Sequence, residues 1–161
     1  MNNINQKNID ILSKYRNDCF EFDFKKIAGD PKTPNHILEI LASVTPIDEP
    51  LSNILIMNIN CPVLFFEKCL LSQKYNHKNM MVKNPNCPVY ILEKLFTPFS
   101  PIEMLVNLAS NPNCPIHILE SLSKYKKYKM SEKYNEFDIK KSLASNINCP
   151  LHILKEIYKK N

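Results

Sequence analysis

Histidine and glutamate recur in this sequence at a spacing that can hold a metal ion or move a proton. His36 and Glu39 form one His-x-x-Glu pair, and His117 and Glu120 form a second. Residues three apart share a helix face, so each pair could supply two ligands. The pairs stand at equivalent places in a repeated segment, three copies apart, or about 30 Å at the usual spacing of packed helices. They therefore predict a solvated ridge, with no metal, cofactor or catalytic role.

Six cysteines raise the same question about metals and disulfides. Four of them occupy one equivalent position in successive copies of the segment, where the first copy has Thr33: Cys61, Cys87, Cys114 and Cys149. Packed helices lie about 8–10 Å apart, whereas a disulfide needs Cα atoms within roughly 7 Å. A shared zinc ion would require the sulfurs to lie closer still. The spacing therefore predicts small buried thiols.

Catalytic motifs are otherwise missing from the sequence. No nucleophile and base stand close together, and no P-loop or dinucleotide fingerprint is present. The single glycine also argues against a Gly-rich phosphate loop. We therefore expect a protein that is not an enzyme.

One repeated segment, residues 111–122, supplies the elements that must position these side chains. It recurs at 58–70, 84–95 and 146–157, with a looser form at 30–41. We number these segments, in chain order, as copies one to five. Their shared proline falls at 34, 62, 88, 115 and 150, so the steps are 28, 26, 27 and 35 residues. Such a period predicts a stacked array of small helical repeats.

Each copy reads as a tight turn followed by a helix, which we call the motif helix. The leading Asn or Asp suits a type I turn, because its side chain can bond forward to the backbone. Counting the Thr or Cys as position 0, apolar residues fill +4, +5 and +8 and predict one buried stripe. The proline at +1 is expected to be the first helical residue, with Thr33 as its N-cap. Where Cys replaces Thr, the neighbouring Asn is expected to help.

A more variable linking helix is predicted before each turn. Its clearest start is Ser100-Pro101-Ile102-Glu103, which has a capping-box pattern. No alternation of period two appears, so no sheet is expected. The predicted organisation is a single repeat domain, 1–161. Its parts are an N-terminal half-repeat at 1–20, repeats around 21–43, 44–72, 73–96, 97–123 and 131–158, and a basic insertion at 123–135.

The chain resembles the leucine-rich repeat variant family over roughly residues 24–158. The resemblance rests on Asn84-Pro85-Asn86-Cys87-Pro88 followed by Ile91, Leu92 and Leu95, and on the same pattern in copy four. HEAT-like helical-hairpin arrays are an equally similar class. The resemblance implies an all-α, right-handed α-solenoid (an alpha-alpha superhelix) of about five helical-hairpin repeats, with some linking helices short or 3₁₀. The repeats here are longer than the family's, and Cys usually replaces Thr. Only Cys19 stands before them, so no iron–sulfur cluster is implied.

The favoured function is protein–protein interaction, with a protein or peptide partner bound on the concave surface formed by one row of helices. The predicted contact residues, called the interaction ridge, are His36, Glu39, Leu64, Glu67, Tyr90, Glu93, His117 and Glu120. The exposed Leu64 and Tyr90 among glutamates would suit a basic or aromatic partner. No long apolar run or signal-peptide pattern is present, so we expect a cytoplasmic monomer without membrane contact.

The alternative function is nucleic-acid binding through a Lys/Tyr-rich segment, residues 123–141. The net charge of +5 arises wholly in residues 81–161, and residues 123–141 hold seven Lys against three acidic residues. Lysines can contact phosphates and tyrosines can stack on bases. The candidates are Lys124, Tyr125, Lys126, Lys127, Tyr128, Lys129 and Lys133. A solvated insertion is the favoured interpretation of this segment, and a patch for an acidic protein is a further alternative.

Overall fold

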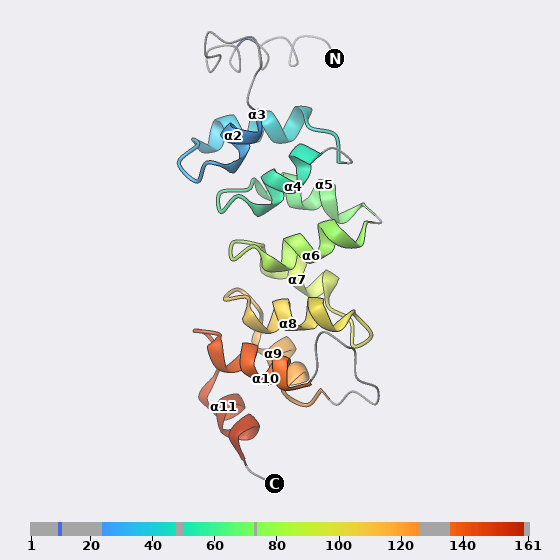
Figure 1. Cartoon of the computed structure of the whole chain (residues 1–161), viewed down its shortest axis with the longest axis vertical. Helices are drawn as coiled ribbons and strands as arrows, with labels where there is room; N and C mark the ends of the chain where they lie inside the picture. The colour runs from blue at the N-terminus through green and yellow to red at the C-terminus, as the bar shows by residue number, and fades with distance from the viewer. Residues whose placement is uncertain (1–9, 11–23, 48–49, 73, 126–135, 160–161) are drawn as a thin grey trace. The chain divides into compact units, whose positions relative to one another are not determined.

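The computed structural model describes residues 10, 24–47, 50–72, 74–125 and 136–159 (Figure 1). Over these residues the chain is all-α, with ten helices and no strand. The chain divides into two compact blocks, Met1–Gln73 and Lys74–Asn161. The division coincides with the predicted start of the third repeat. Of the predicted half-repeat at 1–20 only Asp10 is described, and most of the insertion at 123–135 also lies outside the described residues.

The described residues of the N-terminal block form two linking helices and two motif helices. The linking helices α2 and α4 pack against each other, as do the motif helices α3 and α5. Their bounds are α2 (Phe24–Gly29), α3 (Asn35–Val44), α4 (Pro50–Met57) and α5 (Val63–Leu70).

The C-terminal block continues the same alternation through three copies. The linking helices α6, α8 and α10 pack in succession, and the motif helix α9 packs against α11. Their bounds are α6 (Tyr75–Lys83), α7 (Val89–Leu95), α8 (Ile102–Ser110), α9 (Ile116–Ser123), α10 (Glu136–Ser145) and α11 (Leu151–Tyr158).

Some linking helices are short, as expected, but they differ from the expected 3₁₀ alternative. All five are α-helices, from six residues in α2 to ten in α10, and the described residues include no 3₁₀ helix. The side chains they bury explain the difference. Helix α8 buries Met104 with Leu108 and Leu105 with Ala109. Residues four apart share a face of an α-helix, so this pattern favours α over 3₁₀ geometry.

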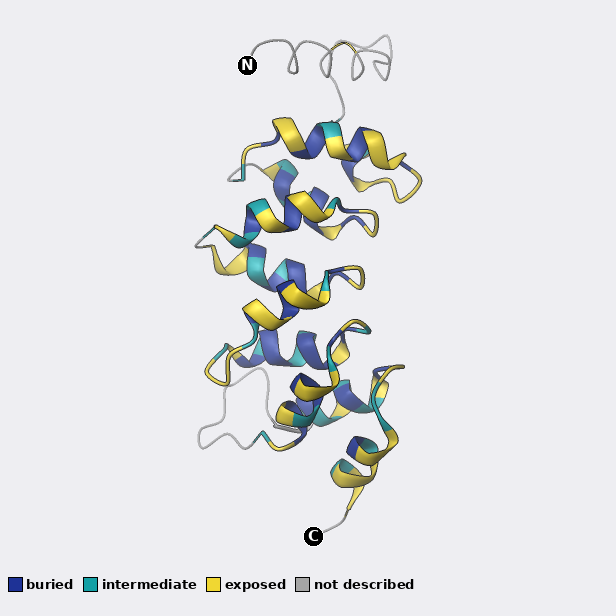
Figure 2. Ribbon diagram, turned by 180° about the vertical axis from the view of Figure 1, so that it is seen from behind, coloured by how far each residue is buried: buried dark blue, intermediate teal, exposed yellow. Residues whose placement is uncertain are grey.

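The predicted apolar stripe is confirmed as the core of each block. Positions +4, +5 and +8 are buried in copies one to four, and helices in Figure 2 are dark blue along one side and yellow along the other. In copy two these positions are Phe65, Phe66 and Cys69. In copy five Ile153 is buried, whereas Leu154 and Ile157 are partly exposed.

The predicted helix starts are wrong by one residue. The shared proline is itself the N-cap, with ψ of 140° at Pro34 and 150° at Pro115, and no side chain caps these helices. The Pro34 carbonyl instead accepts the first helical bonds, from the N–H groups of Ile37 at 2.9 Å and Leu38 at 3.2 Å. The proline ring fixes φ near −65°, a value that suits extended backbone as well as helix. Proline therefore occupies the N-cap position, which in many helices holds a residue with a capping side chain.

Thr33 and Ser100 consequently have other roles than capping. The Thr33 hydroxyl donates to the Ile27 carbonyl, 2.6 Å away in the preceding helix. The Ser100 side chain accepts from the Thr97 N–H at 3.2 Å within the loop before α8, and Pro101 is the N-cap. The capping-box prediction at Ser100 is therefore wrong for the same reason.

Candidate interaction surface

The leading Asn or Asp of each copy closes its own turn, as predicted. In copy four the Asn111 carbonyl accepts from the Cys114 N–H at 3.0 Å, and the Asn111 side-chain oxygen accepts from the Asn113 N–H at 2.8 Å. Asp30 in copy one makes the same forward bond, to the Lys32 N–H at 2.8 Å. The turn therefore has one geometry whether the first residue is Asn or Asp.

The amide group of the same Asn also reaches the preceding copy. The Asn111 Nδ2 donates to the carbonyls of Val82 at 2.7 Å and Asn84 at 2.9 Å. The Asn146 Nδ2 donates to Ala109 at 2.9 Å and Asn111 at 2.8 Å. In each case one acceptor is the backbone carbonyl of the leading residue of the preceding copy. The other acceptor is the carbonyl of the residue two positions before that leading residue.

The N-terminal block contains the same bond, because Asn58 Nδ2 donates to the carbonyls of Ala28 at 2.7 Å and Asp30 at 3.1 Å. This contact was not predicted, although the recurring Asn was its signal. We call these contacts the asparagine ladder. The ladder holds the starts of successive motif helices in register within each block.

In the C-terminal block this register pairs the histidine of one copy with the glutamate of the copy before it. His117 Nε2 lies 3.8 Å from Glu93 Oε1, and His152 Nε2 lies 3.0 Å from Glu120 Oε1. The His-x-x-Glu spacing within a single helix is therefore not what brings these groups together. Each side chain of the two pairs is 45–64% exposed. Among the described residues, no group of three or more His, Cys, Asp or Glu side chains could hold a metal ion.

The remaining ridge residues also lie on the solvent side of their helices. Tyr90 is exposed, and Lys94 Nζ lies 5.7 Å from the centre of its ring. In the N-terminal block His36, Glu39 and Glu67 are exposed, and Leu64 is 75% exposed. The structure therefore places every predicted ridge residue on the surface of its own block, Glu120 being half-buried.

An exposed aliphatic residue, which was not predicted, recurs beside the ridge. Position +2, directly after the proline, holds an exposed apolar residue in four copies: Val63, Val89, Ile116 and Leu151. The repeated apolar residue was a readable signal. It stood outside the +4, +5 and +8 stripe, so it was assigned no role. Positions +2 and +6 lie one helical turn apart, which places Val89 beside Glu93 and Ile116 beside Glu120.

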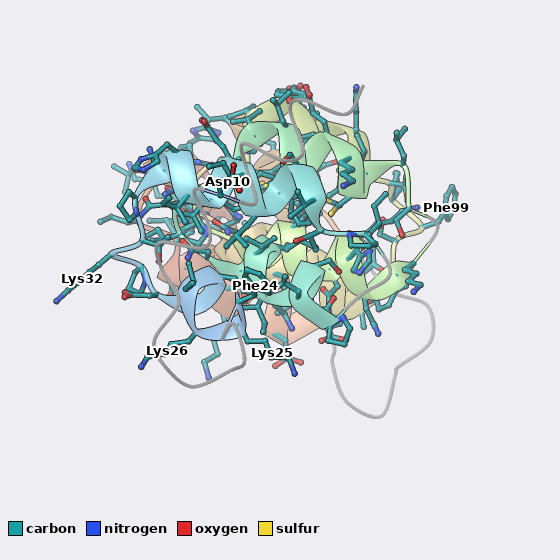
Figure 3. The ribbon with its side chains drawn as sticks, turned by 90° about the horizontal axis from the view of Figure 1, so that it is seen from above. Asp10, Phe24, Lys25, Lys26, Lys32 and Phe99 are labelled. Carbon is teal, nitrogen blue, oxygen red and sulfur yellow. The ribbon has the colours of Figure 1, made fainter. Side chains whose placement is uncertain are left out.

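A separate apolar side chain lies after α7. Phe99 is 94% exposed, and in Figure 3 it projects away from the ribbon. It belongs to a turn closed by the bond from the Ser100 N–H to the Thr97 carbonyl, 3.0 Å. The turn lies at the other end of α7 from the ridge.

The cysteines at position 0 are the predicted small buried groups in three copies, and the prediction is wrong for the last copy. Cys61, Cys87 and Cys114 are buried, and Cys149 is half-buried. Desolvation by burial raises the pKa of Cys87 and of Cys114 from 9.0 to about 12. The thiolate is the reactive form of cysteine, so both groups are unreactive near neutral pH.

The candidate nucleic-acid segment falls largely outside the described residues. Lys124 is exposed and Tyr125 is half-buried, while Lys126, Lys127, Tyr128, Lys129 and Lys133 are not described. The nucleic-acid function therefore stays a prediction.

Comparison with protein-family models, curated proteins and solved structures finds no match to this chain. In the described part of the chain, none of the helices is long and apolar enough to cross a membrane.

Proposed function

We propose that the chain is a non-enzymatic α-solenoid that binds a protein or peptide through the interaction ridge. The alternating linking and motif helices, the ladder and the resemblance to leucine-rich repeat variant and HEAT-like proteins support this architecture. In such arrays the same surface position recurs once per repeat, which gives an extended binding surface. The right-handed superhelix and the cytoplasmic location are part of the proposal.

The exposed aliphatic and aromatic side chains at +2 and +3 are the observation that carries the proposal. Val63 and Leu64 lie side by side at the start of α5, and Val89 and Tyr90 do so at the start of α7. Single exposed apolar residues are ordinary on a protein surface. An apolar residue that recurs at one surface position in four copies is instead typical of a binding surface.

The charges around these residues indicate the kind of partner. Glu93 and Glu120 each lie one turn beyond an exposed aliphatic residue, and Glu67 does so beyond Val63. An exposed His–Glu pair contributes little to stability, typically under about 1 kcal/mol. The carboxylates of Glu93 and Glu120 are therefore available to a partner at low cost. A peptide that alternates basic and apolar side chains fits this pattern.

Site-specific crosslinking in the cells that produce the protein tests the proposal. A photoreactive residue replaces Ile116 on the ridge side of α9, and in a matched variant it replaces the exposed Lys141 on α10. We expect a discrete protein adduct from position 116 that is absent from position 141. The second substitution Val89→Asp should abolish the adduct, whereas Ser145→Asp, on the exposed side of α10, should not.

Adducts that form equally from both positions, or that persist after Val89→Asp, would show that the ridge is not the binding surface. An adduct to nucleic acid instead of protein would favour the Lys/Tyr-rich alternative.

A further inference from the structure

A threonine or serine stands directly before proline at four places in this chain, and the structure divides these places into two kinds. The hydroxyl-bearing residues are Thr33, Thr45, Thr97 and Ser100. Thr33 and Thr45 are buried, and the Thr33 hydroxyl also donates to the Ile27 carbonyl at 2.6 Å. Thr97 is exposed and Ser100 is half-buried. Of the four hydroxyl groups, the two between α7 and α8 are therefore the ones that an enzyme can reach.

These two residues belong to a short segment that is not helical. Helix α7 ends at Leu95, and Pro101 is the N-cap of α8. Between them lies Phe99, which projects away from the ribbon in Figure 3. Exposed loop tips give access to enzymes that act on a folded chain, because little structure must open first. The segment is therefore a suitable place for covalent modification.

Thr97 is better placed than Ser100 to leave the turn. The Thr97 Oγ1 lies 2.9 Å from the Ser100 Oγ, and the Ser100 N–H donates to the Thr97 carbonyl at 3.0 Å. Exposed hydrogen bonds such as these are exchanged for bonds to water at small cost. Ser100 directly precedes Pro101, whose carbonyl accepts the first two bonds of α8, at 2.9 and 3.2 Å. The residues after Thr97 can therefore be extended without unwinding α8, whereas those after Ser100 cannot.

We propose that Thr97 is a phosphorylation site for a proline-directed protein kinase. The Thr97 hydroxyl oxygen forms a bond to the γ-phosphorus of a nucleoside triphosphate, and the bond from that phosphorus to the bridging oxygen of the β-phosphate breaks. The nucleoside diphosphate leaves, and the hydroxyl proton passes to a base of the kinase. Pro98 supplies the selectivity, because a kinase pocket without an acceptor for the next backbone N–H favours proline, which has no N–H.

Phosphorylation would change both the charge and the hydrogen bonding of the turn. Residues 96–101 include no charged side chain, and a phosphothreonine carries about −1.5 to −2 charges at pH 7. The Thr97 oxygen, once esterified, can no longer donate to the Ser100 Oγ. The modification would therefore convert a neutral turn beside the exposed Phe99 into an anionic one. The turn lies at the other end of α7 from the ridge, so this inference does not rest on the ridge's function.

Phosphopeptide mapping of the native chain, isolated from the cells that produce it with phosphatases inhibited, tests the site. We expect phosphate on Thr97 and none on Thr33 or Thr45. In a second measurement the purified chain is incubated with a purified proline-directed kinase and labelled ATP. Thr97→Val, which keeps the size of the side chain, and Pro98→Ala should each lose most of the incorporated label. The matched variant Ser100→Ala should keep it.

Absence of phosphate from Thr97 in the protein from its own cells would overturn the proposal, as would phosphate on Ser100 alone. Phosphate on Thr33 or Thr45 at the level found on Thr97 would show that burial does not select the site. Full incorporation of label into Thr97→Val or Pro98→Ala would also contradict the assignment.

Discussion

The side-chain amide of Asn146 donates to the backbone carbonyl of Asn111, its own counterpart one copy earlier, at 2.8 Å. Both residues are buried, and the same amide also satisfies the Ala109 carbonyl. A buried polar group without a partner typically costs about 1–3 kcal/mol. A mutation that breaks this contact should lower the free energy of unfolding by roughly that amount. The asparagine ladder therefore fixes one register between copies, because a slipped arrangement would leave these groups unpaired.

Asn111→Asp should lower the free energy of unfolding by about 2–4 kcal/mol near neutral pH. The change keeps the bond to the Asn113 N–H but replaces two donated bonds with a carboxylate against the carbonyls of Val82 and Asn84. Urea denaturation measures the loss. Asn113→Asp is the control, because Asn113 is exposed and its side-chain donation to the Cys87 carbonyl is long, at 3.4 Å. Similar losses in both variants would contradict the ladder.

Cys114→Thr should change the free energy of unfolding by less than about 1 kcal/mol, because a new hydrogen bond offsets the added methyl group. Thr33 shows the arrangement, since its hydroxyl donates to a carbonyl six residues earlier. The equivalent acceptor for position 114 is the Leu108 carbonyl. Cys114→Val, which has similar size and no hydroxyl, should be less stable than Cys114→Thr. If thermal melts show Cys114→Val to be more stable than Cys114→Thr, the hydroxyl does not form this hydrogen bond.

Stability should fall as the pH rises from about 9 to about 12, partly because of two buried thiols. Burial raises the pKa of Cys87 and Cys114 from 9.0 to about 12, so between these values the unfolded chain loses protons that the folded chain keeps. The unfolded state then binds fewer protons, and the free energy of unfolding declines with pH. Below pH 9 these thiols add no slope. The Cys87→Ala/Cys114→Ala double variant should show a shallower decline, and an unchanged slope would contradict the assignment.

Lys68→Met should lower the free energy of unfolding by about 1–2 kcal/mol. The Lys68 ammonium donates to the carbonyls of Thr45 at 2.7 Å and Ala42 at 3.3 Å, at the end of α3. These are carbonyls that the helix itself leaves unpaired or weakly paired. Lys94→Met is the matched control, because Lys94 holds the same position in copy three and is exposed over the Tyr90 ring. Equal denaturation midpoints for the two variants would show that Lys68 does not cap the end of α3.

His117→Gln and His152→Gln should each change stability by less than about 0.5 kcal/mol, because exposed ion pairs contribute little. The expected effect is on the crosslinked adduct from position 116, which should weaken if the ridge binds a partner. Thermal melts and adduct yield separate the two effects. A large loss of stability in either variant would assign the His–Glu contacts to the fold and not to recognition.

The buried stripe could be read from the sequence because it depends on helical periodicity alone. Residues such as Ile91, Leu92 and Leu95 are apolar in every copy at the same spacing, and burial of one face follows directly. The ridge residues could be predicted to lie on the surface, because they stand at positions outside this buried stripe.

The contacts between copies could not be predicted in the same way. The pairing of His152 with Glu120, 32 residues away, depends on how two helices stack and not on any local pattern. The proline N-cap was missed because the residue pattern of a first helical turn and of an extended N-cap is the same when φ is fixed. The second function of the leading asparagine was missed because its turn-closing bond already explained its presence.

The asparagine ladder depends on how far apart neighbouring copies lie in space. It does not depend on the number of residues between them. Asn58 reaches the Asp30 carbonyl across 28 residues, Asn111 reaches Asn84 across 27, and Asn146 reaches Asn111 across 35. Most of the additional residues of the last step lie between α9 and α10, in 124–135, and the bond lengths remain alike. Insertions in the loops that precede linking helices are therefore nearly neutral for the architecture. During evolution, and equally in engineering, those loops are the places where this chain can gain sequence without a change in its scaffold.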